Sequence, residues 1–378
     1  MIKTIDECFF QIQNGANIKQ GDVDGGFPIT RIETTANDKF NRDRMGYAGI
    51  TDISKYESYV LEDGDLLMSH INSVQYLGRT VLYIKEADET IIHGMNLLRL
   101  KSRRDVINPA YARYCFYGHS FRSKVGNITK KSVNQASFAV KDLKQIKIEV
   151  PSLSEQDQIV KVLDKLQNLI KMRNDELSAL DDLIKARFIE MFGNPVSNSY
   201  GLPEATLPDL GKFGRGVSKH RPRNDIKLLG GKYPLIQTGD VANAGLYITS
   251  YCNTYSELGL KQSKMWDKGT LCITIAANIA KTAILEFDAC FPDSVVGFTA
   301  NERTNNVFIH YWFSFFQAIL ESQAPESAQK NINLKILSEL KVIVPEKRKQ
   351  DEFAAFVAQV DKSKVAVQKA LDQTQLLF

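Results

Sequence analysis

The chain has 378 residues, of which 43% are hydrophobic and 24% are charged. At roughly 150 residues per domain, this length predicts two or three domains, and the ordinary composition excludes a disordered or collagen-like chain. The net charge is only +4, so any binding of nucleic acid must depend on local basic patches.

The sequence lacks the usual signals of membrane and secreted proteins. No apolar run approaches the roughly 18 residues that a membrane span needs, and the start, Met1 to Glu7, is too polar for a signal peptide. The five cysteines are scattered without a C-x-x-C pair, which argues for reduced thiols rather than a disulfide framework or a zinc site. We therefore expect a cytoplasmic protein with no metal site.

Similar segments recur in the same order in both halves of the chain, about 200 residues apart. Each half has a glycine in a polar turn, a glycine and an aromatic residue before a proline, a glycine turn entering an apolar strand, a basic residue and a threonine opening another strand, and a strand that ends at a proline. In the first half these are Gly15, Gly26-Phe27-Pro28, Asp63-Gly64-Asp65, Arg79-Thr80 and residues 143–151; in the second half they are Gly216, Gly231-Lys232-Tyr233-Pro234, Lys268-Gly269-Thr270, Lys281-Thr282 and residues 340–345. The repeat predicts two copies of one module.

A helix is predicted after each of these closing prolines. Ser154, with Asp157 three residues later, is the expected N-cap of the first helix, and Gly193-Asn194-Pro195 is its stop signal. Apolar residues in the first helix follow a heptad seam that recurs in the second helix with an offset of 194 positions. The seam residues are Ile159, Leu163, Leu166, Ile170, Leu177, Leu180 and Ile184, and then Phe353, Val357, Val360, Val367 and Leu371.

We expect the two helices to bury their seams against each other. The alternative is that each seam packs on its own globular domain, as most amphipathic helices do. A helix from Ser154 to Phe192 would extend roughly 58 Å at 1.5 Å per residue, well beyond the diameter of a domain of ~150 residues. The length therefore favours a paired-helix spacer.

No catalytic constellation is present in the sequence. Asn108-Pro109-Ala110-Tyr111 is similar to the N-P-P-Y loop of adenine methyltransferases, but no G-x-G turn for S-adenosylmethionine precedes it, and Asn followed by Pro is also an ordinary helix start. Residues 211–216 have no Walker lysine, Pro292-Asp293 has no following Glu-x-Lys, and the histidines form no H-E-x-x-H pattern. We expect a chain that is not itself an enzyme.

Basic residues gather in loops of both halves. Residues 1–150 hold 21 Lys and Arg against 18 Asp and Glu, and residues 196–345 hold 15 against 13, whereas residues 151–195 hold 6 against 8. Residues 41–44, 129–135 and 215–224 mix Lys and Arg with Asn or Gln. Such loops are often only solvated surface, but Lys and Arg bind phosphates and guanine edges, and Asn and Gln bind adenine edges. The mixture favours DNA binding.

Several of these residues give the chain a resemblance to the specificity (S) subunits of type I restriction–modification enzymes. The residues that carry it are Pro151-Ser152-Leu153-Ser154-Glu155-Gln156, residues 189–195, the early glycines of each half, and the strand ends at Pro151 and Pro345. The likeness covers essentially the whole chain. The second helix departs from the pattern, because it opens Pro345-Glu346-Lys347-Arg348-Lys349-Gln350 and the chain stops before a counterpart of residues 187–192.

The resemblance implies a fold, a function and a set of partners. The fold is an α/β (α+β) two-domain repeat with pseudo-twofold symmetry: target recognition domains at 1–150 and 196–345 are separated by two long antiparallel helices, at 151–195 and 346–378, that form a coiled coil. Each domain reads one part of an asymmetric bipartite target in double-stranded DNA, and the helices dock two modification (M) subunits that carry S-adenosylmethionine. Restriction (R) subunits, which use ATP and Mg, complete the nuclease, so this chain is expected to hold no cofactor.

Loop placement and residue type give the candidate DNA-binding side chains. In the first domain they are Arg42, Arg44, Asn72, Gln75, Arg79, Lys130 and Lys131, and in the second they are Lys219, Arg221, Arg223, Gln237, Asn278 and Lys281. A spacer of roughly 60 Å would limit the distance between the two half-sites to about 18 base pairs. The competing hypothesis is a coiled-coil scaffold whose globular halves bind proteins.

Overall fold

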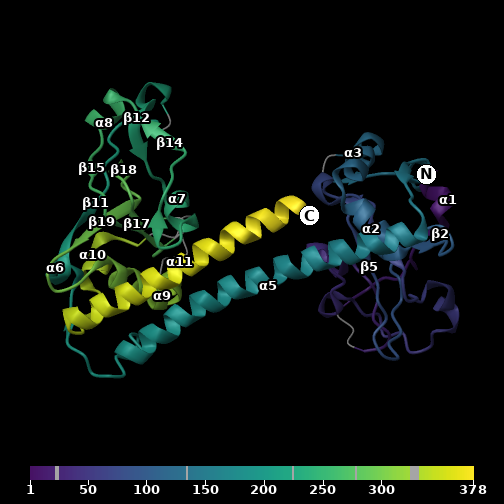
Figure 1. Ribbon diagram of the computed structural model, residues 1–378, viewed down its shortest axis with the longest axis horizontal. Helices are drawn as coiled ribbons and strands as arrows, with labels where there is room; N and C mark the ends of the chain where they lie inside the picture. Colours follow the sequence, from purple (N-terminus) through teal and green to yellow (C-terminus); the bar gives the residue numbers. More distant parts are fainter. Residues whose placement is uncertain (22–24, 133–134, 224, 277–278, 324–331) are drawn as a thin grey trace. The chain divides into compact units, whose positions relative to one another are not determined.

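The computed structural model describes residues 1–21, 25–132, 135–223, 225–276, 279–323 and 332–378, with the side chains of 318–323 excepted. The chain divides into two compact units (Figure 1). The first unit is Met1–Ile170 together with Thr374–Phe378, and the second is Lys171–Gln373. Two long helices, α5 (Leu153–Phe192) and α11 (Lys347–Leu377), each contribute residues to both units.

The first unit is built on a four-stranded antiparallel sheet. Its strands, in spatial order, are β2 (Phe9–Asn14), β6 (Leu97–Ser102), β3 (Leu66–Ser69) and β5 (Thr80–Leu82). Smaller sheets are formed by β1 (Ile2–Thr4) with β9 (Lys147–Glu149), and by β4 (Ile71–Asn72), β8 (Ala136–Ser137) and β7 (Lys130–Lys131). The helices are α1 (Ile5–Cys8), α2 (Pro109–Tyr117), α3 (His119–Ile128) and α4 (Val140–Lys144), with 3-10 turns η1 (Ile32–Asp38), η2 (Arg42–Arg44), η3 (Ser54–Tyr59) and η4 (Val74–Tyr76).

In the second unit, the described residues form two larger sheets and one strand pair. The first sheet is β11 (Gly211–Arg215), β19 (Val295–Ala300), β16 (Leu271–Thr274), β17 (Thr282–Leu285) and β13 (Tyr247–Ile248), and the second is β14 (Asn253–Tyr255), β12 (Leu229–Leu235), β18 (Ala289–Cys290) and β15 (Met265–Trp266). The pair is β10 (Glu204–Ala205) with β20 (Val342–Ile343). The helices are α6 (Leu207–Leu210), α7 (Thr238–Asn243), α8 (Glu257–Lys261), α9 (Asn306–Gln323) and α10 (Leu334–Glu339), with the 3-10 turn η5 (Ile226–Leu228).

The two units repeat one arrangement of strands. The order β2-β6-β3-β5 recurs as β11-β19-β16-β17, and the register recurs too, because Met68 lies opposite Thr80 as Ile273 lies opposite Thr282. The turns before β3 and β16 place Gly64 and Gly269 at the same φ of +88°, a conformation that favours glycine. The repeat predicted from the sequence is therefore confirmed.

The first long helix begins slightly before its predicted cap. Ser152 and Glu155 form the capping box: the Glu155 carboxylate accepts from the Ser152 backbone N–H at 2.9 Å, and the Glu155 N–H donates to Ser152 Oγ at 3.3 Å. The predicted cap at Ser154 with Asp157 is wrong, because the chain can turn helical directly after Pro151 and Asp157 instead bonds the Asn108 side chain. The predicted end is confirmed, since Gly193 follows the last helical residue with φ +74°.

The repeated frame carries different core residues in its two copies. Arg99 on β6 is 1% exposed and donates to the carbonyl oxygens of Val60 at 2.9 Å and Ser58 at 2.7 Å. The matching position on β19 is Gly297, where an added Cβ would come within 2.7 Å of the Trp266 ring. At this position the first unit thus has a buried guanidinium group, whereas the second has a glycine against which the Trp266 ring packs. The two modules therefore share a frame but differ in their cores.

Acid should destabilise the first unit through its buried histidines. Burial lowers the pKa of His93 to about 3 and that of His70 to about 4. Below the ordinary value near 6.5 the unfolded chain binds protons that the folded chain does not, so the free energy of unfolding falls as pH drops from 6.5 toward 4. For His93 the loss at pH 5 is about 2 kcal/mol. Urea unfolding of the full chain at pH 7 and pH 5 measures it.

The His93→Gln variant isolates the contribution of that histidine. We expect it to be less stable than the wild type at pH 7, because His93 Nε2 lies 2.9 Å from the Leu97 carbonyl oxygen, yet to lose less stability between pH 7 and pH 5. His119→Asn is the matched control, since His119 is exposed. An equally steep pH profile in His93→Gln and the wild type would contradict the assignment.

Candidate nucleic-acid interface

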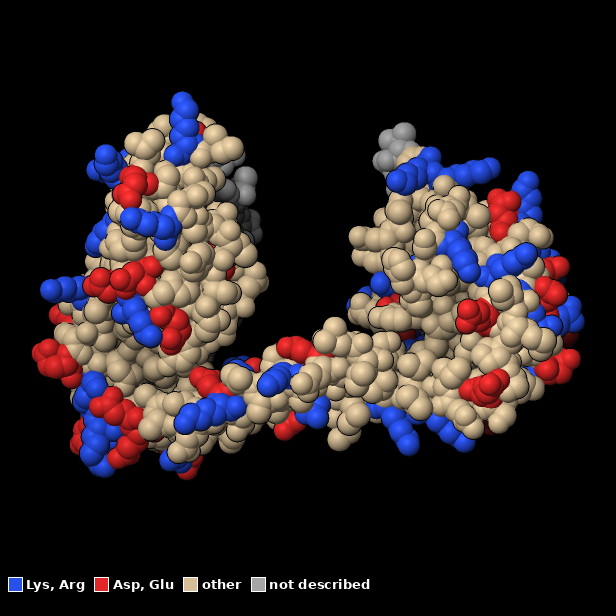
Figure 2. All heavy atoms as spheres, turned by 45° about the horizontal axis from the view of Figure 1, so that its top comes forward, with Lys and Arg blue, Asp and Glu red and all other residues tan. Residues whose placement is uncertain are grey.

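Basic and acidic side chains are interspersed over both globular parts in the view of Figure 2, in agreement with the small net charge.

Arg42, a predicted DNA contact, is already bound within its own domain. Its Nε and NH2 groups donate to the two carboxylate oxygens of Glu89, at 2.9 and 2.6 Å, and its NH1 lies 2.9 Å from Glu86. The hydrogen bond from Arg42 lowers the pKa of Glu89 to about 2. This bidentate pair fixes the loop and leaves the guanidinium little capacity for a phosphate.

Arg79 is likewise held by neighbouring side chains. Its Nε lies 3.0 Å from Asp38, and its guanidinium stacks 4.8 Å from the centroid of the Tyr76 ring. Gln75, in η4, and Arg44, in η2, are exposed. Of the predicted arginines of the first domain, Arg44 is thus the one whose side chain is exposed to solvent.

The three-stranded sheet β4-β8-β7 brings three predicted residues together. Ala136 on β8 pairs with Asn72 on one side and with Lys131 on the other, and Lys130 is next to Lys131 on β7. Both lysines are exposed. Asn72 is partly committed, because its side-chain amide donates to Ser69 Oγ at 3.3 Å and its oxygen accepts from the Ser73 N–H at 2.7 Å. An amide side chain close to two exposed ammonium groups is an arrangement suited to DNA.

In the second domain, Asp293 forms ion pairs with both arginines of the predicted basic loop. Arg223 forms an ion pair with one oxygen of Asp293, and Arg221 lies 3.5 Å from the other. Arg221 also donates to the Ser218 carbonyl oxygen at 2.6 Å. Both arginines stay about half exposed, and Lys219 is exposed as well. These contacts order the loop while keeping its cationic groups at the surface.

A cavity of about 340 Å³ lies beside this loop. Arg223 and Gln237, both predicted, are part of its lining, together with Asn253 and Tyr255 of β14, which the sequence reasoning missed. The sequence carried no clear signal for them, because β14 is only three residues long and its pairing with β12, which leads to Gln237, is a tertiary feature. The hydroxyl of Ser218, also in the lining, is buried with no hydrogen-bond partner among the described residues. The site therefore offers amide, guanidinium and hydroxyl groups in one hollow.

Two predicted residues of the second domain are not brought to this loop. Lys281 precedes β17 and lines a different cavity, next to the long helices. Asn278 lies outside the described residues. The predicted set thus divides between two places in the second unit.

The long helices pack against each other within the second unit (Figure 1). The ring of Phe353 on α11 contacts Phe192 and Phe188 on α5, at centroid distances of 5.7 and 5.4 Å. Further along, Lys364 donates to the Asp181 carboxylate at 2.6 Å. Residue numbers fall on α5 as they rise on α11, so the pair is antiparallel. One buried cluster contains the predicted seam residues Ile184, Phe353, Val357 and Val360, with Leu180 packed against it.

The other predicted seam residues differ in burial. Val367 and Leu371 are buried; Leu163, Leu166, Ile170 and Leu177 are half-buried; Ile159 is 37% exposed. In the first turns of α5 it is Val160, next to Ile159, that packs against the core of the first domain. Phe188 and Phe192 extend the buried face of α5 and were missed, because alternating steps of three and four after Ile184 lead to Arg187 and Met191 instead.

A buried glutamine fastens the start of each long helix to the domain before it. Gln156 is 0% exposed, and its amide donates to the carbonyl oxygens of Val106 at 3.0 Å and Pro151 at 2.9 Å. Its oxygen accepts from the Asn108 backbone N–H at 2.8 Å. Asn108 is the N-cap of α2, as the helix-start interpretation of Asn108-Pro109 predicts. We call this set of bonds the glutamine latch.

The glutamine latch is repeated at α11. Gln350, also 0% exposed, donates to the carbonyl oxygens of Arg303 at 3.0 Å and Pro345 at 2.8 Å, and it accepts from the Thr304 hydroxyl at 2.8 Å. In both copies the next residue on the helix, Asp157 or Asp351, accepts from an asparagine side chain, that of Asn108 or Asn305. The duplication thus extends to the individual hydrogen bonds that join helix and domain.

Comparison with known proteins matches this duplicated architecture. A family model described as "Type I restriction modification DNA specificity domain" matches residues 3–180 and again residues 204–374. The chain belongs to this family. As a type I specificity subunit it has two target recognition domains and serves DNA sequence recognition, and it is not the catalytic component.

Individual relatives agree with the family assignment. The putative type I restriction enzyme MjaX specificity subunit of Methanocaldococcus jannaschii is 27% identical over 98% of this chain and 90% of that protein. The EcoKI specificity subunit of Escherichia coli is 24% identical over 53% of this chain and 43% of that protein. The S subunit of the type I system of M. genitalium has the same fold, with a TM-score of 0.57 at 15% identity over 100% of this chain and 93% of that one. A structure from a study of type I complex assembly gives a TM-score of 0.61 at 14% identity, over 100% and 93%.

In the part of the chain that the structure describes, no helix of this specificity subunit combines the length and apolar character that crossing a bilayer requires.

Proposed function

We propose that the two target recognition domains, at 1–150 and 196–345, each read one part of an asymmetric bipartite sequence in double-stranded DNA. The observation that carries this proposal is the repetition of one sheet order and register in two modules with unlike cores and surfaces. Two identical modules would read two identical half-sites. Unlike modules on one frame read unlike half-sites in equivalent orientations.

The contacts that we propose with DNA follow from exposure and chemistry. Lys130, Lys131, Arg44 and Lys219 supply phosphate contacts, with affinity that falls as salt rises. Asn72, Gln75, Gln237, Arg221 and Arg223 are the residues that we propose to read base edges, with about 1–3 kcal/mol of discrimination for each good bidentate contact. Arg42 and Arg79 act through the loops that they hold, because Glu89 and Asp38 already occupy their guanidinium groups.

The long helices, at 151–195 and 346–378, are proposed to fix the gap between the half-sites and to dock two M subunits. α5 has 40 residues, which corresponds to about 60 Å. Outside the seam, Val162, Leu169 and Leu183 share one heptad position, which Glu176 interrupts, and they are 57%, 42% and 47% exposed. An apolar row of this kind on a helix is typical of a surface that binds another protein.

Partners and cofactors follow from this role. M subunits would bring S-adenosylmethionine, and R subunits would bring ATP and Mg to the assembled nuclease, in the cytoplasm. The chain's own residues bind and orient DNA; they supply no step of methyl transfer or cleavage.

Exchanging one domain tests the proposal. Replacing residues 1–150 with the matching domain of a related specificity subunit should change one half of the methylated sequence and leave the other half and the gap intact. Mapping N6-methyladenine in a host that expresses the chimaera with the M subunit measures this. The reciprocal exchange of 196–345 should change the other half. An unaltered methylated sequence after either exchange would support the scaffold hypothesis instead.

A further inference from the structure

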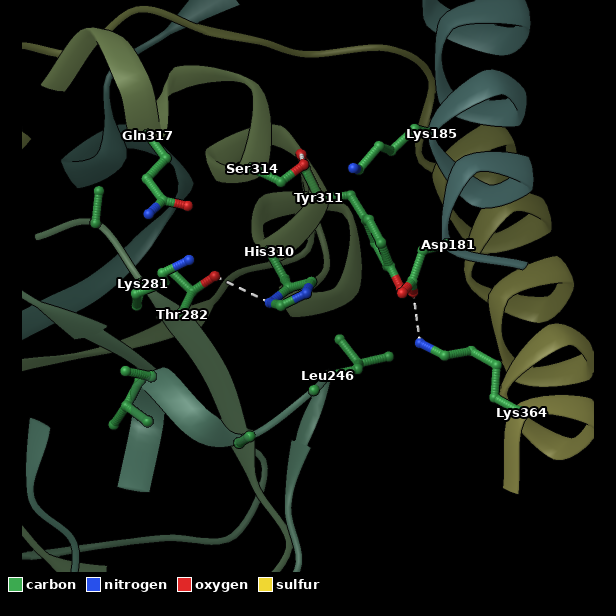
Figure 3. A pocket seen from close by; sticks show the side chains of 15 residues that line it. Asp181, Lys185, Leu246, Lys281, Thr282, His310, Tyr311, Ser314, Gln317 and Lys364 are labelled. Carbon is green, nitrogen blue, oxygen red and sulfur yellow. Dashed lines mark hydrogen bonds and ion pairs between the residues drawn. The ribbon is translucent and has the colours of Figure 1, made fainter. Parts of the chain in front are cut away.

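A second cavity of the second unit lies where the domain meets the helix pair. It measures about 270 Å³ and is lined from four sides: by α5 and α11, by α9, by the turn after α7, and by the loop before β17. Figure 3 shows Lys185 reaching in from α5, Lys281 on the opposite wall, and His310, Tyr311 and Ser314 of α9 between them. The proposed DNA-reading loop at 219–223 contributes no residue to this lining.

The three lysines that line this cavity differ in whether a carboxylate lies close to their ammonium group. Lys364 is neutralised by Asp181 at 2.6 Å, and Lys185 has a loose, exposed contact of 3.9 Å with Asp182. Lys281 is half-buried, and no described carboxylate lies within ion-pair distance of its ammonium group. A half-buried ammonium without a counter-ion is costly, because burial removes part of its hydration.

The rest of the lining supplies hydrogen-bonding groups rather than further charge. The Thr282 hydroxyl lies 2.9 Å from His310 Nδ1. Burial lowers the pKa of His310 to about 4, so its ring is neutral at physiological pH. The Ser314 hydroxyl also belongs to the lining, but it donates its proton to the Tyr311 carbonyl oxygen at 2.6 Å. Ammonium groups with hydroxyl and imidazole neighbours are the usual surroundings of a bound oxyanion.

In the first unit, the cation at the equivalent position has a carboxylate beside it. The repeat makes Arg79 the counterpart of Lys281, since the Arg79 carbonyl accepts from the Ser69 N–H at 2.8 Å as the Lys281 carbonyl accepts from the Thr274 N–H at 2.9 Å. Arg79 has an anion of its own, the Asp38 carboxylate at 3.0 Å. Asp38 is held in the left-handed region, at φ 56°, which is unusual for a residue with a side chain. The first unit therefore uses a strained backbone to supply a carboxylate to this cation.

We propose that the cavity around Lys281 binds a small phosphate-type oxyanion, which takes the place that the Asp38 carboxylate holds in the first unit. Lys281 and Lys185 bind its charge from opposite walls, and the imidazole of His310 is the hydrogen-bonding group beside it. The volume accommodates a tetrahedral oxyanion with ordered water. The bound anion would link α5 to the loop before β17 and so brace the domain against the helix pair. This site goes beyond the proposed reading of DNA bases and does not depend on it.

Titration of the purified full chain with inorganic phosphate, at constant ionic strength and followed by calorimetry, tests the site. We expect saturable binding at one site. Lys281→Gln should weaken it about tenfold, as expected for the loss of one charge-assisted hydrogen bond. Arg79→Gln is the matched control in the first unit and should leave the affinity for phosphate unchanged.

A second pair of variants keeps the test independent of the lysine. Ala244 lines the cavity, so Ala244→Asp places a carboxylate inside it and should abolish phosphate binding, whereas the similarly sized Ala244→Asn should bind more tightly than Ala244→Asp. Adding excess duplex DNA of unrelated sequence identifies which kind of phosphate occupies the cavity. If the DNA displaces inorganic phosphate, the site binds a phosphate of the DNA backbone; if inorganic phosphate stays bound, the site binds a free ion. Absence of saturable binding to the wild type, or equal affinity in Lys281→Gln, would overturn the proposal.

Discussion

Replacing Gln350 with leucine should lower the free energy of unfolding of the second unit by about 4 kcal/mol. The substitution removes a buried amide that makes three hydrogen bonds. It leaves the carbonyl oxygens of Arg303 and Pro345 and the Thr304 hydroxyl without partners in a site that water does not reach. Unpaired buried groups cost about 1–3 kcal/mol each, which is why the expected loss is large for a residue of similar volume. Urea unfolding followed by circular dichroism measures it.

Gln368→Leu is the control for this experiment, because Gln368 lies on the same helix and its side chain donates to Asp372 one exposed turn away. We expect a change of a few tenths of a kcal/mol there. Gln156→Leu should repeat the large loss in the first unit, since Gln156 also makes three hydrogen bonds, with the Asn108 backbone N–H in place of the threonine hydroxyl. A change below about 1 kcal/mol in both Gln350→Leu and Gln156→Leu would show that the glutamine latch does not hold helix and domain together.

The features of this fold that depend on short-range backbone chemistry could be predicted from the sequence. The strands that end at Pro151 and Pro345, the glycine turns before β3 and β16, and the helix after each proline depend on backbone chemistry within a few residues. The position of the helix cap could not be decided, because Ser152 and Ser154 both precede an acidic residue by three positions. What separates them is the tertiary bond from Asn108 to Asp157.

The candidate site was harder to predict, since the availability of a cation depends on distant partners. Arg42 and Arg79 have the residue type and loop placement of a DNA contact. Their carboxylates, on Glu89 and Asp38, are 47 and 41 positions away in the chain, and no local pattern indicates such a pairing. The same limit applies to the burial of Gln156, whose partners include the Val106 carbonyl. Sequence patterns gave the modules and the helices; side-chain pairing between segments needed the structure.

The helix pair makes a second large effect predictable, in the complex that we propose with the M subunits. Asp181 pairs with Lys364 and Phe192 with Phe353, so residue 174 of α5 has its counterpart near residue 371 of α11. Inserting one heptad after Asn174 and another after Ala370 keeps the seam in register on both helices. It lengthens the pair by about 10.5 Å, which corresponds to about three base pairs of DNA.

Mapping N6-methyladenine across a genome that expresses this doubly extended subunit with its M partner tests the central claim most directly. A helix pair that sets the spacing predicts unchanged half-sites separated by a gap about three base pairs longer than in the wild type. The half-sites serve as the internal control, because neither recognition domain has been altered. Methylation at the original spacing by the extended subunit would contradict the account.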